Sequence, residues 1–157
     1  KSLAVDTIDL SNVDVLINNA AIDTLNNTLY KNFSYTSIVD MVNVNLLAPM
    51  LLVNKFIKEN NKGTIINITS SCINRPSTLG HTIYHTTKNS LSIFTKAIRE
   101  EIKLNNFRVV EIIPGRTDTD INVDKHNSIL PKDVAETVLF CINNTFIQEI
   151  TVKHPKR

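Results

Sequence analysis

The chain has 157 residues, of which 42% are hydrophobic and 20% charged, the size and composition of one soluble globular domain. Its 17 basic and 15 acidic residues are scattered and give a formal net charge of +2, which argues against nucleic acid as a partner. Cys72 and Cys141 lie far apart without metal-ligand spacing, so we expect two reduced thiols and no metal site. No apolar run approaches the roughly 20 residues that cross a bilayer, and the start lacks the order of a signal peptide. The sequence therefore predicts a cytoplasmic protein with no membrane partner.

The first half of the chain predicts two strands separated by a helix. Residues 13–18 (VDVLIN) are a short apolar run with β-branched residues, which is typical of a strand buried on both faces. From position 35 to about position 60, apolar residues recur every three or four positions and predict one helix, which Ser34 or Thr36 can cap. Residues 64–68 (TIINI) follow Gly63 and predict the second strand.

The second half continues the alternation. A long helix is predicted from about 82 to 105, and a third strand over residues 108–113, ended by Pro114 and Gly115. Pro131 opens another helix (PKDVAETVLFCI), and residues 149–153 (EITVK) can form a last strand. Strands joined by crossover helices predict an α/β fold, a doubly wound parallel sheet of the Rossmann-like type, with residues 1–157 in a single domain.

Polar or turn residues follow each of the first three predicted strands. They lie at positions 18–21, 69–71 and 114–117. In open α/β sheets ligands bind outside the carboxyl ends of the strands, so these positions are the first place to look for chemistry. Tyr84 and Lys88 are four residues apart at the start of the long helix and share one face. A Lys ammonium near a phenol favours the phenolate and lowers the phenol pKa toward the working range of an acid/base catalyst.

Four ordered segments resemble the short-chain dehydrogenase/reductase family. They are VLINNAA (15–21), VNLLAP (44–49), IINITSS followed by YHTTK (65–88), and IIPGRTDTD (112–120). Each segment alone is weak, but the ordered set is specific and covers nearly the whole chain. The resemblance implies an oxidoreductase that uses NAD or NADP and transfers a hydride between the nicotinamide and a small-molecule carbonyl or secondary alcohol.

The resemblance also implies residue roles. Tyr84 would be the general acid in carbonyl reduction and the general base in alcohol oxidation, and Lys88 would lower its pKa and hold the nicotinamide ribose. Ser70 would orient the substrate oxygen, and Asn45 would hold a water that relays protons through Lys88. The other predicted cofactor contacts are Asn19 and Ala20 near the adenosine ribose, and Pro114, Gly115, Thr117 and Thr119 beside the nicotinamide.

Some assignments stay open at this point. Ser71 competes with Ser70 because it lies nearer the family's usual distance before the Tyr, and Asn43 competes less seriously with Asn45. His81 and His85 flank Tyr84, but no Cys, Asp or third His lies near them at ligand spacing. We therefore interpret both histidines as pocket-rim or surface residues.

The family's Gly-rich phosphate-binding front end has no counterpart here, because the chain has only three glycines, Gly63, Gly80 and Gly115. The predicted strand 13–18, central in the family, would then lie at a sheet edge. We expect this chain alone to be poorly stable and to bind nicotinamide nucleotides weakly or not at all, and the full-length protein to be a homo-oligomer, a dimer or tetramer. Two other hypotheses are a non-catalytic remnant that acts as an interaction module through its long helices, and a sugar-nucleotide epimerase, for whose substrate domain the short C-terminal region leaves little room.

Overall fold

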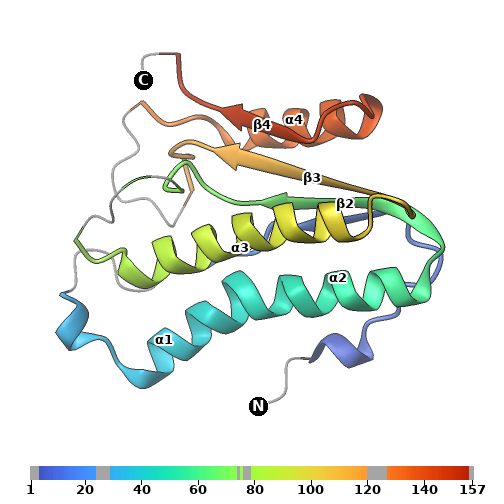
Figure 1. Cartoon of the computed structure of the whole chain (residues 1–157). Coiled ribbons are helices and arrows are strands. Elements are labelled where there is room, and N and C mark those ends of the chain that lie inside the picture. Colours follow the sequence, from blue (N-terminus) through green and yellow to red (C-terminus); the bar gives the residue numbers. More distant parts are fainter. Residues whose placement is uncertain (1–3, 24–28, 74, 76–78, 120–126, 156–157) are drawn as a thin grey trace.

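The computed structural model describes residues 4–23, 29–73, 75, 79–119 and 127–155, in which a parallel sheet lies between two layers of helices (Figure 1). The four strands of this sheet are β1 (Val15–Asn18), β2 (Lys62–Ile68), β3 (Asn106–Pro114) and β4 (Glu149–Val152). All neighbouring strands pair in parallel, in the order β1-β2-β3-β4. The predicted α/β Rossmann-like fold is confirmed.

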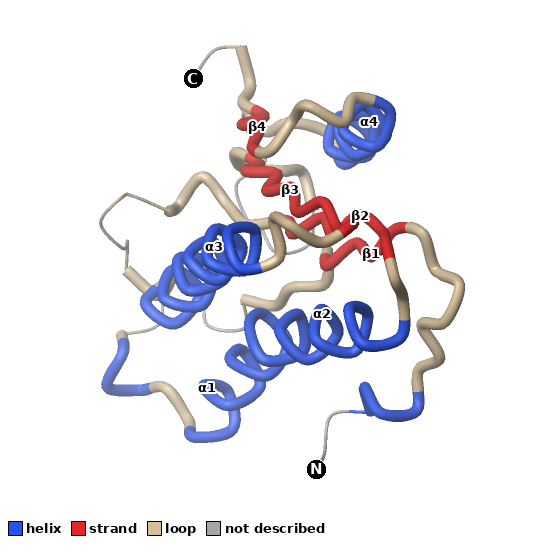
Figure 2. The backbone as a smooth tube through the Cα atoms, turned by 45° about the vertical axis from the view of Figure 1, so that its right-hand side comes forward, coloured by secondary structure: helices blue, strands red, loops and turns tan. Residues whose placement is uncertain are grey.

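The helices cover the two faces unequally. Their bounds are α1 (Tyr35–Val42), a π-helical segment (Asn43–Leu47), α2 (Ala48–Glu59), α3 (Thr82–Glu101) and α4 (Pro131–Asn143), with short 3₁₀ turns at Ala4–Thr7 and Tyr30–Asn32. Figure 2 shows α1, α2 and α3 on one side of the sheet and α4 on the other. Helix α4 contacts β3 and β4, so it covers the C-terminal half of its face.

The predicted single helix over positions 35–60 is interrupted by the π-helical segment. Ser34 caps α1 as expected, because its hydroxyl accepts a hydrogen bond of 3.1 Å from the backbone N–H of Ser37. Pro49, in the first turn of α2, has no N–H to donate to the carbonyl of Asn45 four residues earlier, which weakens the α-helical pattern there. Apolar periodicity cannot reveal such an interruption, since one widened turn shifts the pattern only slightly. The segment matters because π-helical turns often lie at functional sites.

Two apolar clusters hold the layers together. The cluster between the sheet and α2 and α3 contains Leu10, Leu16, Val53, Phe56, Ile65, Ile102 and Val109. The cluster under α4 contains Ile66, Ile68, Val110, Ile112 and Cys141. Gly63 lets β2 approach Phe56, because a Cβ at this position would lie 2.5 Å from the Phe56 ring. Strand β1 lies at one edge of the described sheet, as predicted, and Ile17 on the α4 side is 43% exposed.

The helical stretch Tyr35–Glu59 corrects one sequence expectation, because it is long and apolar enough to cross a bilayer by length and composition. Its apolar character has another explanation in the fold. Helix α2 packs on β1 and β2, and its Val53 and Phe56 side chains are buried in the core. A core helix of this kind is weak evidence for a membrane span.

Candidate active site

A cavity of about 1150 Å³, which we call the strand-end cavity, lies at the carboxyl ends of the first three strands. Asn19 and Ala20 after β1, Ser70 after β2, and Gly115 after β3 contribute to its wall. Helix α4 contributes apolar side chains such as Leu139. Such a position is where open parallel sheets bind ligands, so the fold brings the predicted strand-end residues to one place.

Tyr84 and Lys88 enter the strand-end cavity from the first two turns of α3. The Ser70 side chain lies close enough to the Tyr84 phenol to lower its pKa. Lys88 is only 2% exposed, and its Nζ donates a hydrogen bond of 2.8 Å to the carbonyl oxygen of Ile68 at the end of β2. The same Nζ lies 6.0 Å from the centre of the Tyr84 ring. A hydroxyl, a phenol and an ammonium therefore converge beside β2.

Burial governs the protonation of this cluster. It raises the pKa of Tyr84, with smaller upward contributions from Cys72 and Asp23, against a lowering by the nearby Ser70 side chain. Burial also lowers the pKa of Lys88 from 10.5 to about 8. Lys88 is not among the groups that shift the pKa of Tyr84 here. Its ammonium donates a hydrogen bond to the Ile68 carbonyl, and its role in lowering the pKa of Tyr84 stays a prediction.

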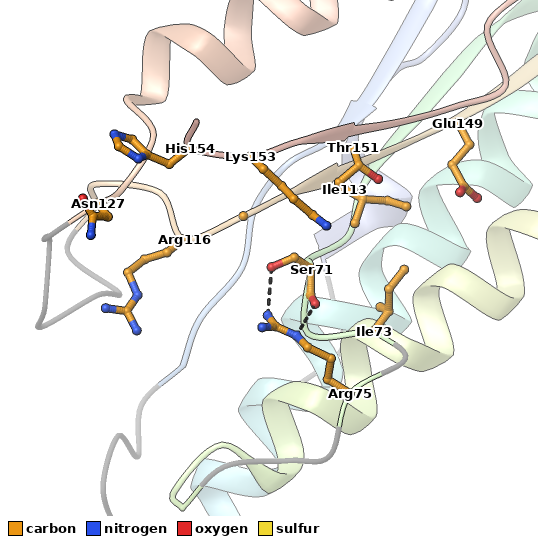
Figure 3. Close-up of a pocket in the computed structure, with 11 residues that line it drawn as sticks. Ser71, Ile73, Arg75, Ile113, Arg116, Asn127, Glu149, Thr151, Lys153 and His154 are labelled. Carbon is orange, nitrogen blue, oxygen red and sulfur yellow. Dashed lines mark hydrogen bonds between the residues drawn. The ribbon is translucent and has the colours of Figure 1, made fainter. Parts of the chain in front are cut away.

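Ser71 pairs with Arg75. Its hydroxyl accepts a hydrogen bond of 3.0 Å from Arg75 Nη2, and its carbonyl accepts one of 2.7 Å from Arg75 Nε (Figure 3). Its backbone N–H donates to the carbonyl of Pro114 at 2.7 Å. Figure 3 shows Ser71 and Arg75 in the wall of a second, smaller cavity of about 410 Å³. Of the two candidate serines, the structure brings Ser70 to the tyrosine, while the catalytic role of Ser70 stays a prediction.

Asn45 lies behind the cavity wall, in the π-helical segment, and is fully buried. Its side-chain amide makes two hydrogen bonds of 2.8 Å with the backbone of Ile22, one to the N–H and one to the carbonyl oxygen. Its Nδ2 is also 3.3 Å from Thr87 Oγ1 on α3. Asn45 thus ties the loop after β1 to the helix layer, and the water-holding role that the resemblance implies stays a prediction.

All the predicted cofactor contacts line the strand-end cavity. They are Asn19, Ala20, Tyr84, Lys88, Pro114, Gly115, Thr117 and Thr119. A Cβ on Gly115 would lie 3.3 Å from the carbonyl oxygen of Val152, so glycine allows the end of β3 to pack closely against β4. The cavity is large enough for a nucleotide-sized ligand and combines apolar walls with hydroxyl and amide groups. These residues fit the nicotinamide riboside end of NAD or NADP, whereas the three glycines of the chain form no phosphate-binding Gly-rich turn.

A model of the short chain dehydrogenase family matches residues 3–129. The chain belongs to this family. It is 30% identical over 151 residues to an NADP-dependent 3-hydroxy acid dehydrogenase of Schizosaccharomyces pombe, covering 85% of this chain and 58% of that protein. It is 31% identical over 154 residues to a ketoacyl reductase of Nostoc sp., covering 91% of this chain and 53% of that protein.

Solved structures of short-chain dehydrogenases share the fold. The 3-ketoacyl-(acyl-carrier-protein) reductase from Brucella melitensis, complexed with NADH, has a TM-score of 0.82 at 23% identity, covering 92% of this chain and 67% of that one. The chain spans little more than half the length of the two curated relatives above.

Two residues near Tyr84 form a pair that the sequence did not reveal. His81 Nδ1 lies 2.6 Å from Asp23 Oδ2, and both residues line the strand-end cavity together with His85. Both histidines lie in the cavity wall, which agrees with their interpretation as pocket-rim residues, but His81 has an acidic partner that the spacing did not show. Asp23 comes from the loop after β1, 58 residues earlier in the chain, so local spacing could not show it. The position of Asp23 just beyond a strand end was the one available signal.

Proposed function

We propose that the full-length protein is an NAD(P)-dependent oxidoreductase that interconverts a carbonyl compound and a secondary alcohol. The observation that carries the proposal is the convergence of Ser70, Tyr84 and Lys88 in one cavity at the carboxyl ends of the strands. Membership of the short-chain dehydrogenase family supports it. The names of the two similar proteins, a hydroxy acid dehydrogenase and a ketoacyl reductase, support the same reaction class. The non-catalytic remnant is not favoured, because such a protein has no need to keep this cluster.

When bound, the nicotinamide cofactor would supply the hydride for reduction or accept it in oxidation. Pro114, Gly115, Thr117 and Thr119 would hold the nicotinamide end of the cofactor. Asn19 and Ala20 would line its adenosine side.

Ser70 and Tyr84 would bind the reacting carbonyl oxygen between their hydroxyl groups, since both side chains line the cavity and lie close to each other. The raised pKa keeps the Tyr84 phenol protonated at neutral pH, which suits a general acid that gives its proton to the oxygen. Lys88, with a pKa of about 8, would stabilise the phenolate that remains and return a proton to it. Asn45 would hold the water through which Lys88 exchanges protons with solvent. In alcohol oxidation the same proton movements run in reverse.

The direct test is Tyr84→Phe in the full-length protein, with Tyr35→Phe as the matched control because Tyr35 is 81% exposed on α1. Oxidation of NADH and NADPH is followed with a panel of aldehydes and ketones, and cofactor binding is measured by fluorescence. Tyr84→Phe should lower kcat by about two to four orders of magnitude while cofactor binding changes little. Turnover that survives Tyr84→Phe would refute the assignment.

We further propose that the full-length protein is cytoplasmic, acts on small molecules and forms a homo-oligomer, and that residues 1–157 make up the catalytic portion of one domain. Large apolar side chains exposed on the helix layer support self-association; they are Val42, Leu47, Met50, Leu51 and Ile93. Light scattering of the full-length protein tests this proposal. A monomer at micromolar concentration would refute the oligomer.

A further inference from the structure

Asp23 and His81 form a carboxylate–imidazole pair in the wall of the strand-end cavity. The Asp23 side chain is 2% exposed and the His81 side chain 30% exposed, so the pair has a buried acidic end and an open imidazole end. His81 is the residue just before α3, three positions ahead of Tyr84. The imidazole therefore opens into the cavity within one helical turn of the predicted general acid.

The hydrogen bond fixes what His81 can offer to a ligand. A carboxylate only accepts hydrogen bonds, so the proton of the neutral imidazole lies on Nδ1 and points at Asp23 Oδ2, 2.6 Å away. Nε2 then carries the lone pair. Within the described part of the chain Nε2 has no hydrogen-bond partner, and it is not among the buried polar atoms that lack one. In the neutral ring, Nε2 is therefore an accessible acceptor on a side chain that lines the cavity.

The pair is held in place by the layer behind it. Asn45 binds both backbone polar groups of Ile22 at 2.8 Å, and Ile22 directly precedes Asp23. His81 is anchored on its other side, where its carbonyl accepts the first helical hydrogen bond, of 2.8 Å, from the N–H of His85. A side chain whose backbone and ring are both fixed loses little entropy on binding a ligand, which is what a specificity-determining residue needs.

His85 is the other imidazole near His81. His85 has a pKa lowered mainly by burial, and its ring centre is 6.1 Å from that of His81 and 6.5 Å from that of Tyr84. His85 is thus close to both rings, and all three side chains line the strand-end cavity. A substrate whose carbonyl reaches Tyr84 therefore lies in the same cavity as His81, which precedes Tyr84 by three positions.

We propose that His81, oriented by Asp23, binds a hydroxyl group of the substrate, so that the enzyme prefers hydroxylated carbonyl compounds, with the hydroxyl within a few bonds of the reacting carbonyl. The inference rests on the proposed function and adds the substrate class to it. The substrate hydroxyl donates its proton to Nε2, while the carbonyl oxygen lies between Ser70 and Tyr84. His81 is a substrate-binding residue in this account, and Asp23 is a positioning residue that acts through it.

The experiment compares matched ketones with the full-length protein. The pairs differ only by one hydroxyl group beside the carbonyl, from acetone and hydroxyacetone to the corresponding compounds with longer alkyl chains. Oxo acids of the same chain lengths form a third arm. The measured quantity is the ratio of kcat/KM for the hydroxylated ketone to kcat/KM for the plain ketone, in the parent and in His81→Leu.

The parent should prefer the hydroxylated ketone, and His81→Leu should lower that ratio about tenfold, since a neutral hydrogen bond to the substrate is lost. Asp23→Ala should lower the ratio in the same direction, whereas Asp23→Asn, which keeps an oxygen acceptor for Nδ1–H, should restore most of it. The double variant His81→Leu/Asp23→Ala should be no worse than His81→Leu, because the two residues act as one unit.

The outcomes separate this inference from the proposed function. A parent that reduces plain and hydroxylated ketones equally, or a preference that persists in His81→Leu, would overturn the inference and leave the proposed function standing. A His81-dependent preference for the oxo acids would also overturn it, because a carboxylate needs a donor at Nε2. A parent that reduces no carbonyl compound with either NADH or NADPH would overturn the proposed function and the inference with it.

Discussion

Replacing Lys88 by methionine removes a buried ammonium from α3 while keeping most of the side-chain volume. Lys88 is 2% exposed, and its Nζ has one hydrogen bond, of 2.8 Å, to the Ile68 carbonyl. One hydrogen bond does not replace the hydration of an ammonium, which accounts for the lowered pKa. We therefore expect Lys88→Met to abolish turnover. At neutral pH the variant should also lose the free-energy cost of burying a charged ammonium, a cost that the parent bears because its chemistry needs the lysine.

The magnitude follows from the pKa. Burial lowers it from 10.5 to about 8, and a difference of about 2.5 in pKa corresponds to about 3 kcal/mol of folding free energy. Because the folded-state pKa lies below the unfolded-state value, the unfolded chain binds more protons between pH 8 and 10.5, so stability gains from this residue as pH rises through that window. Below pH about 8 the full penalty is present. The lost hydrogen bond to Ile68 offsets part of the gain in the variant by about 1.5–3 kcal/mol, but that loss does not vary with pH in this way.

Urea unfolding of the full-length parent and variant, followed by circular dichroism at several pH values from about 7 to 10.5, measures this difference. The free energy of unfolding of Lys88→Met minus that of the parent should fall by about 3 kcal/mol across the window. Lys103→Met is the control, since Lys103 lies just beyond α3 and its side chain is 62% exposed. A difference between variant and parent that stays constant with pH would refute the reasoning.

Two further predictions concern the stability of the full-length protein and the behaviour of residues 1–157 expressed alone. Arg108→Met should destabilise the full-length protein by about 1–3 kcal/mol in urea unfolding, because Arg108 Nη2 donates a 2.8 Å hydrogen bond to the Cys141 carbonyl near the end of α4; an unchanged unfolding midpoint would contradict this role. Residues 1–157 expressed alone should unfold with weak cooperativity and bind NADH weakly or not at all, because β1 is a sheet edge whose Ile17 is 43% exposed. A sharp cooperative transition together with tight NADH binding would be the contrary result.

The strands and their order were predictable because the pattern is local. Runs such as residues 64–68 and 108–113 are continuously apolar, which is typical of strands covered on both faces, and β2 and β3 are buried on both faces toward their carboxyl ends. Strands that alternate with helices form a parallel sheet, because each crossover helix packs on a face of that sheet. The element ends differ by a few residues from the predictions, since the terminal turns depend on packing rather than on periodicity.

Three features of the site could not be read from the sequence. The π-helical segment around Asn45 leaves the apolar pattern almost unchanged, so the periodicity of apolar residues cannot detect it. The Asp23–His81 pair joins two loops 58 residues apart, which only the folded chain brings together. The direction of the Tyr84 pKa depends on desolvation and on the side chains that the fold brings near it, and residue spacing says nothing about either. Residue identity predicted which groups meet in the cavity, and the fold decides how they are charged and oriented.

Transfer of deuterium tests the central claim most directly. The full-length protein is incubated with a carbonyl substrate and NADH or NADPH that carries deuterium at the hydride-donating ring carbon, and the alcohol product is analysed by mass spectrometry and proton NMR. The account predicts one deuterium at the carbinol carbon of the product, and product formation slowed by about two to four orders of magnitude in Tyr84→Phe. An alcohol without deuterium at that carbon, or labelled product formed at the parent rate by Tyr84→Phe, would contradict it.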